Sequence, residues 1–138
     1  MTLRYRWAKG SLPPPGHYSL GIDLDGSAGR AWLKAGYGRA PVFESLFVAD
    51  ADALGALWAA LDIAGLWADW PRPEHRSIGG SPWRLTATDG DRRAEIHHNA
   101  TGSDGRSPHP FREAVEALVP DALWTDLRAR RTALLKAS

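Results

Sequence analysis

The sequence predicts an α+β domain in which an antiparallel sheet carries a helical layer on one face. Strand-like segments with alternating apolar and polar residues lie both before and after a central helical pattern. That pattern, between Asp50 and Gly65, repeats apolar residues at helical spacing. Two further helical segments close the chain. The order strands, helix, hairpin, helices is also found in many small bacterial domains, but this analogy of architecture implies no activity.

Composition indicates one soluble domain, because 138 residues with 43% hydrophobic and 24% charged residues are ordinary values for such a chain. A net charge of +1 favours neither nucleic acid nor an anionic membrane as a partner. The absence of cysteine excludes disulfides and thiol chemistry, and it fits a reducing compartment. No segment resembles a signal peptide or a membrane span. We therefore expect a cytoplasmic protein without a cofactor.

Four strands are predicted before the central helix. The first is Leu3–Trp7, and the run Pro13–Pro15 then forms a rigid connector, with a polyproline ligand as the less favoured interpretation. His17–Asp25 alternates most cleanly, and Arg30–Tyr37 returns after a turn with Tyr37 on the core side. Val42–Val48 has bulky residues on both faces, which is typical of a strand that is covered on both sides or lies at a corner.

The central helix is apolar nearly all round. Asp50 or Asp52 can cap its first turn, and Gly65 can end it in the left-handed conformation. We expect its sheet-facing side to comprise Leu54, Leu57, Trp58 and Leu61. The rear side, which needs a cover from elsewhere, comprises Ala56, Ala59, Ala60 and Ile63.

A hairpin and two helices complete the predicted fold. Strands Trp83–Thr88 and Asp91–Asn99 flank Asp89-Gly90, a typical two-residue turn. This register pairs Trp83 with Ile96, Arg84 with Glu95, and Leu85 with Ala94. Pro110 begins one helix and Asp121 the next. The last helix ends in a small basic cluster, for which a solvated helix end is favoured over a nucleic-acid contact: Arg128, Arg130, Arg131 and Lys136.

Short motifs give little support to catalysis or metal binding. His97 and His98 are adjacent in a strand and so point to opposite faces, which disfavours a shared metal ion. Asp23 and Asp25 share a face but are typical of solvated residues before a turn. The glycine-rich segment 78–82 lacks the strand-to-helix context of an anion-binding loop. The glycosylation pattern at 99–101 has no secretory context.

The remaining candidate is a surface, which we expect on the non-core side of the strands. An exposed Trp32 among charges of both signs resembles an interface anchor with a polar rim. The competing interpretation is that a helix covers this face and that Trp32 is core. The predicted binding residues are Asp23, Arg30, Trp32, Lys34, Arg84, Glu95 and His97, with Thr86 and Arg93 beside them.

Two function classes follow from this surface. The first is a non-catalytic interaction protein that binds a protein partner through the sheet face or a strand edge. The alternative is a small enzyme with a carboxylate and histidine site formed by Asp23, Glu95 and His97. An enzyme needs these groups to converge in a concave, partly dry pocket, whereas an interaction protein can leave them on an open face.

We also expect self-association. The rear side of the central helix and the two edges of the sheet are both surfaces that need a cover or invite pairing. Most homo-oligomers are two-fold dimers. The sequence therefore favours a homodimer that buries either the helix side around Ile63 or a sheet edge.

Overall fold

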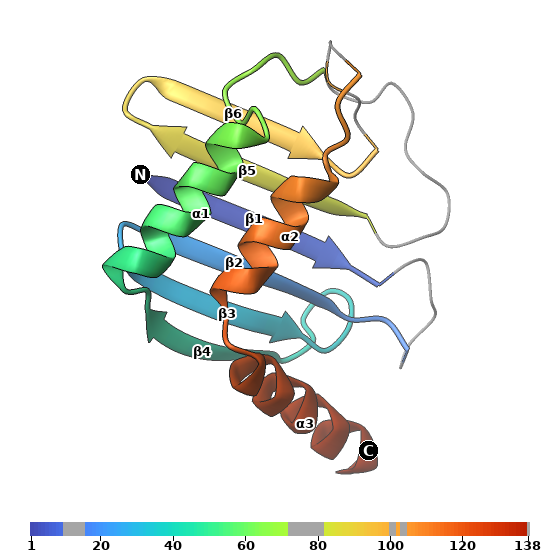
Figure 1. Ribbon diagram of the computed structural model, residues 1–138. Helices are drawn as coiled ribbons and strands as arrows, with labels where there is room; N and C mark the ends of the chain where they lie inside the picture. Colours follow the sequence, from blue (N-terminus) through green and yellow to red (C-terminus); the bar gives the residue numbers. More distant parts are fainter. Residues whose placement is uncertain (10–15, 72–81, 100–101, 103–104, 138) are drawn as a thin grey trace.

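The computed structural model describes residues 1–9, 16–71, 82–99, 102 and 105–137. It confirms the predicted class, because helices pack on a six-stranded antiparallel sheet whose strand order is β4-β3-β2-β1-β5-β6 (Figure 1). The strands are β1 (Thr2–Ala8), β2 (Ser19–Asp25), β3 (Ala28–Lys34), β4 (Val42–Val48), β5 (Trp83–Asp89) and β6 (Arg92–His97). The helices are α1 (Ala51–Ile63), α2 (His109–Leu118) and α3 (Asp121–Ala137).

Strand β1 is central to the sheet, although it comes first in the chain. It pairs with β2 on one side and with β5 on the other, both antiparallel. Strands β2, β3 and β4 form a meander, and β5 and β6 form a separate hairpin. The pairing of β1 with β5 therefore joins two segments that are separated by more than half the length of the chain.

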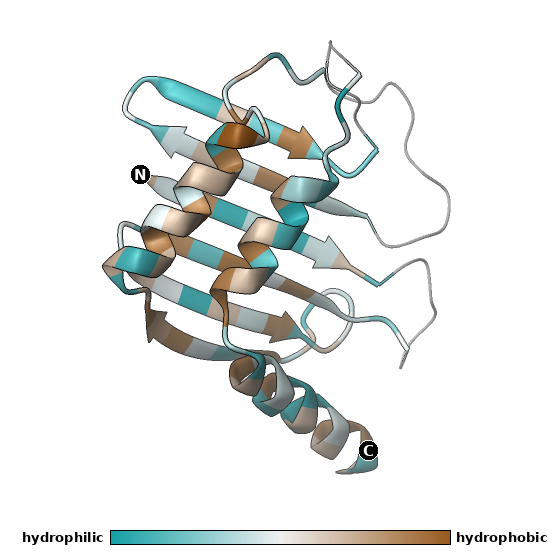
Figure 2. Ribbon diagram, viewed as in Figure 1, coloured by the Kyte–Doolittle hydropathy of each residue, from teal (hydrophilic) through white to brown (hydrophobic). Residues whose placement is uncertain are grey.

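Helices α1 and α2 lie side by side on one face of the sheet, and α3 contacts β3 and β4 (Figure 1). The alternating strands present apolar residues to these helices, and brown and teal segments alternate along them in Figure 2. Leu57 and Leu61 of α1 are buried there, as are Phe111 and Val115 of α2. The core thus lies between the helices and one face of the sheet.

The ends of α1 follow the predicted capping pattern. The Asp50 side chain, and not that of Asp52, accepts a hydrogen bond from the Ala53 backbone N–H at 2.7 Å. Gly65 follows the helix with a φ of +90°, a conformation in which other residues are strained. Among the described residues, no helix is both long and apolar enough to cross a bilayer.

The prediction for β3 was wrong at both ends. The turn after β2 is tighter than expected, because Asp25 already pairs with Ala28 and Gly26 adopts a φ of +59°. The strand then ends at Lys34, so Tyr37 lies beyond it and is 52% exposed. Tyr37 stacks on His17, with ring centroids 3.6 Å apart, and is not part of the core.

The predicted hairpin register was also wrong. The turn residues are Gly90 and Asp91, because Asp89 pairs with Arg92. Gly90 has a φ of +59° and so occupies the position that requires glycine. The observed pairs are Leu85 with Ile96, Arg84 with His97, and Thr86 with Glu95. The error shifts each partner by two positions, so every side chain keeps its predicted face.

Strand β4 is an edge strand and is not covered on both sides. Phe43 and Phe47 on the helix side are partly buried against the core. On the other side Leu46 is 73% exposed and Val48 is 80% exposed. The predicted proline connector and the segments 78–81 and 100–101 lie outside the described residues.

Candidate functional site

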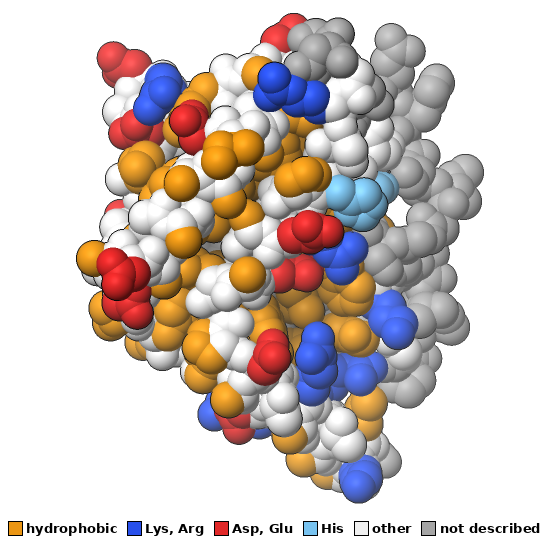
Figure 3. All heavy atoms as spheres, viewed as in Figure 1, with side chains coloured by type: hydrophobic (Ala, Val, Ile, Leu, Met, Phe, Trp, Pro, Cys, Tyr) orange, Lys and Arg blue, Asp and Glu red, His pale blue; other side chains and the backbone are white. Residues whose placement is uncertain are grey.

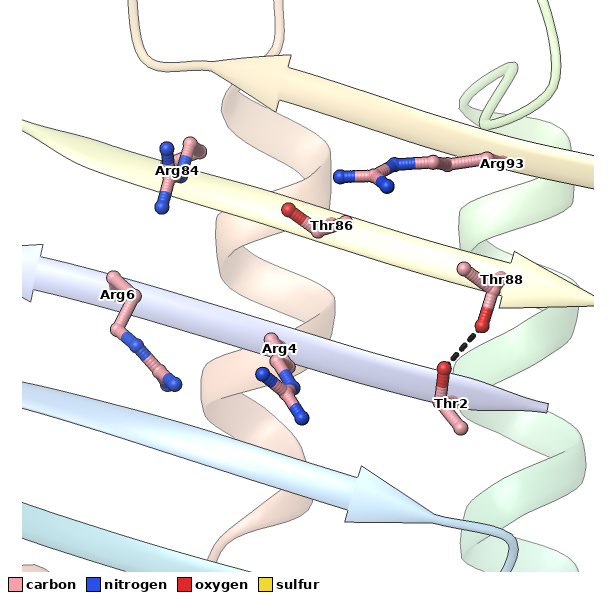
Figure 4. A pocket seen from close by; sticks show the side chains of 7 residues that line it. All are labelled: Thr2, Arg4, Arg6, Arg84, Thr86, Thr88 and Arg93. Atoms are coloured by element: carbon pink, nitrogen blue, oxygen red, sulfur yellow. Dashed lines mark hydrogen bonds between the residues drawn. The ribbon is translucent and has the colours of Figure 1, made fainter.

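The polar face of the sheet has no helix over it in the part of the chain that the structure describes. Helices α1 and α2 lie behind the strands when this face is viewed from the front (Figure 4). We call this surface the open face. It carries Thr2, Arg4, Arg6, Gly21, Asp23, Arg30, Trp32, Lys34, Glu44, Leu46, Arg84, Thr86, Thr88, Arg93, Glu95 and His97.

The structure places all the predicted binding residues on the open face. Strand alternation assigns each one to this side, and the sheet order sets their neighbours. One row across all six strands reads Glu44, Trp32, Gly21, Arg6, Arg84 and His97. Residues that are far apart in the sequence thus form one continuous surface.

A chain of ion pairs crosses the open face from β1 to β4. Arg6 Nη1 lies 2.8 Å from Asp23 Oδ1, and Arg30 Nη1 lies 3.2 Å from Asp23 Oδ2. Arg30 also donates to Glu44, and this hydrogen bond is the main cause of the raised pKa of Arg30. These charged groups are partly exposed, so the series of ion pairs adds little to the free energy of unfolding. It does hold the four side chains in place.

Trp32 of β3 lies flat on the open face of the sheet. It is opposite Gly21, and a Cβ atom at Gly21 would overlap the indole ring. The Arg6 guanidinium lies 4.9 Å from the ring centroid, within the range of a cation–π contact. The indole N–H is buried and has no acceptor among the described residues. Trp32 is therefore held by its ring contacts, half-buried between Gly21 and Arg6.

A hollow of about 370 Å³ lies on the open face over β1, β5 and β6 (Figure 4). Four arginines and three threonines line it, and among the described residues no carboxylate does. We call it the basic hollow. Its residues are Thr2, Arg4, Arg6, Arg84, Thr86, Thr88 and Arg93.

The residues of this hollow that the sequence prediction left out of the candidate surface are Thr2, Arg4, Arg6 and Thr88. Alternation in β1 already put Arg4 and Arg6 on the polar side. The missing information was the pairing of β1 with β5, which sets Arg4 opposite Thr86 and Arg6 opposite Arg84. No local sequence signal encodes such a long-range pairing.

The residues of the alternative catalytic site do not converge. His97 Nε2 lies 3.4 Å from Glu95 Oε1, and Arg84 Nη1 lies 3.8 Å from the same oxygen. Asp23 is on β2, three strands away from β6, which is roughly 14 Å at the usual strand spacing. Its carboxylate is already bound by Arg6 and Arg30. The three groups therefore form two separate clusters.

Within the described ranges, no group of three histidine, aspartate or glutamate side chains is placed to hold an ion. The pKa of His98 is lowered, mainly by burial and then by the neighbouring His97. The two histidines are thus side by side in sequence without a shared ligand set.

The basic cluster of α3 is partly engaged within the chain. Arg130 Nη2 lies 2.9 Å from Asp126 Oδ2, one helical turn away. The Arg131 guanidinium lies 4.5 Å from the ring centroid of Tyr18. Two of the four side chains of this cluster therefore have partners within the chain.

No protein-family model and no curated protein sequence matches this chain.

Proposed function

We propose that this chain is a small non-catalytic interaction protein that binds a protein partner through the open face. The observation that carries this proposal is a sheet face without a helical cover in the described residues, on which half-buried Trp32 lies among charged side chains. Aromatic and arginine side chains are the usual anchors of protein interfaces, and a rim of charges sets specificity. Both kinds of residue meet on the open face.

The same geometry gives less support to an enzyme. Catalysis needs an acid, a base and a binding group within hydrogen-bond reach of one reacting atom. Asp23 lies several strands from Glu95 and His97, and ion pairs hold its carboxylate.

The lack of cysteine fits an interaction protein of the cytoplasm.

Partner capture with matched variants tests this function. The tagged chain is used to isolate bound proteins from the cells that produce it, and each captured protein is purified and titrated against the chain by calorimetry. We expect Arg84→Glu to weaken binding by about tenfold or more, since it reverses a charge on the open face. Its side chain is 55% exposed, so folding should not suffer.

The control is Glu113→Lys, a charge reversal at an exposed position of α2 on the opposite side of the sheet. It should leave the affinity within about twofold. A partner that binds the Arg84→Glu variant as tightly as the parent contradicts the open face as the binding surface. A partner that is lost only with Glu113→Lys would place the interface on the helices.

We also propose that a second copy of the chain pairs with the edge of β4. The backbone bonds Ala35 N–H to Pro41 O and Ala49 N–H to Ser27 O flank the β3–β4 ladder. Bonded pairs alternate in an antiparallel ladder, so the odd-numbered residues of β4 bond to β3. The backbone groups of Val42, Glu44, Leu46 and Val48 then face the outer edge.

The side chains of this edge suit a copy of itself. Val42, Leu46 and Val48 are exposed, and Glu44 is the one charge among the four outward-facing residues. A two-fold pairing about Ser45 sets Val42 of one copy opposite Val48 of the other and separates the two Glu44 carboxylates. The other edge, β6, carries charged residues that discourage such pairing.

A further inference from the structure

We infer that the basic hollow binds a phosphate group carried by a phosphorylated segment of the protein partner. This inference rests on the proposed function and names the chemistry that the partner brings to the open face. Arginine clusters are the usual means of recognising phosphorylated segments, because their guanidinium groups form paired hydrogen bonds to phosphate oxygens.

The first argument is that the positive charge of the hollow is only partly compensated, since Arg6 is the one lining arginine with a close ion pair among the described residues. Arg4 and Arg93 form no hydrogen bond or ion pair with any described residue, and both are exposed. Arg84 has only a 3.8 Å contact with Glu95, which is outside the lining. Like charges gathered over three neighbouring strands repel one another, and a bound dianion relieves that repulsion.

The second argument is the arrangement of hydrogen-bond donors. Arg4 is opposite Thr86, and Arg93 is opposite Thr88. The threonine hydroxyls line the hollow between arginines from β1, β5 and β6, and the Arg93 guanidinium points toward Thr86 (Figure 4). A phosphate has three terminal oxygens that accept hydrogen bonds from several directions, whereas a carboxylate has two. A hollow surrounded by donors therefore suits a phosphate better.

The third argument favours a protein segment over a nucleic acid. Proteins that bind single strands combine a basic groove with aromatic rings on which bases stack. Strands β1, β5 and β6 present no Trp, Tyr or Phe on the open face. The ring of Trp32 lies on β3 and is not part of the lining of the basic hollow. The net charge of +1 is also too small to hold a long phosphate backbone.

Calorimetric titration of the intact chain with a short phosphoserine peptide tests the inference. The same peptide with unmodified serine and with glutamate, inorganic phosphate, and an oligothymidylate are titrated in parallel. We expect the phosphopeptide to bind more tightly than each of the four. Arg4→Gln and Arg93→Gln should each weaken it by about tenfold, the usual effect of losing one charged hydrogen bond.

The control variant is Arg39→Gln, which removes an exposed arginine outside the hollow. It should change phosphopeptide affinity by less than about twofold. Equal losses with Arg39→Gln and Arg4→Gln would reduce the effect to overall charge and overturn the site.

Each other probe has a defined meaning. No phosphopeptide binding, or binding equal to that of the serine peptide, overturns the inference. Equal affinity for the glutamate peptide makes the ligand a carboxylate, equal affinity for inorganic phosphate makes it a free anion, and tighter oligothymidylate binding makes it a nucleic acid. A captured partner that needs Arg84 but no phosphate keeps the proposed function and removes this inference. Phosphopeptide binding without any captured partner keeps this inference and removes the proposed function.

Discussion

Glycine at position 21 lets the open face hold a tryptophan. Because Gly21 has no side chain, the Trp32 ring can lie against the sheet and under Arg6. Sequence alternation placed Trp32 on the polar side, but it could not show that the ring lies flat. That contact depends on which β2 residue is opposite Trp32, and this register is a tertiary property.

Gly21→Ala tests this packing. The new Cβ would overlap the Trp32 ring, and displacing it should lower the free energy of unfolding by about 1–3 kcal/mol. Denaturant titration measures the change. Gly55→Ala is the matched control, because a Cβ there meets nothing within 4 Å. It should stabilise α1 by about 0.5–1 kcal/mol. A neutral Gly21→Ala would show that Trp32 does not rest on Gly21.

At the scale of elements, each strand's face was predictable while the exact pairing was not. A period of two is a property of the strand alone, so the core and open faces of the hairpin were assigned correctly. The register depends on the turn, and both Asp89-Gly90 and Gly90-Asp91 suit a two-residue turn. The positive φ of Gly90 is compatible with either turn, which explains why the predicted register differs from the observed one by two residues.

For strand β4, the sequence predicted two apolar faces but not what covers each of them. Bulky residues on both sides of a strand indicate two apolar surfaces, but they do not say what covers the second one. The exposure of Leu46 and Val48 shows that no described residue covers it. The rear side of α1 is in the same situation, since Ile63 is 83% exposed and hydrophobic side chains gather over α1 (Figure 3).

Light scattering at high micromolar concentration tests the proposed pairing of β4. We expect the mass of two chains for the parent. Leu46→Lys should give the mass of one, because lysine on an edge strand prevents pairing. Ile63→Arg, on the exposed side of α1, should remain dimeric. A monomeric parent removes the dimer, and dissociation by Ile63→Arg alone transfers the interface to the helix.

At the scale of the whole molecule, the sheet separates a dry face from a polar one. The sequence contains enough apolar residues for helices to cover one face of a sheet. The α+β fold class could be predicted from that property. Whether a helix also covered the second face was undetermined, because the apolar rear side of α1 suggested a further layer. The structure shows α1 and α2 on the same side of the sheet (Figure 1). The open face follows from this arrangement.

Thiol accessibility tests the central claim, that the polar face is uncovered, most directly. The chain has no cysteine, so a single introduced thiol is unambiguous. Thr86→Cys places it in the basic hollow, and Ala87→Cys places it one residue along β5 in the core, where Ala87 is 1% exposed. We expect maleimide to label the first at nearly the rate of an unfolded control, and the second far more slowly. Equal protection of both thiols would mean that the polar face is covered and would contradict this account.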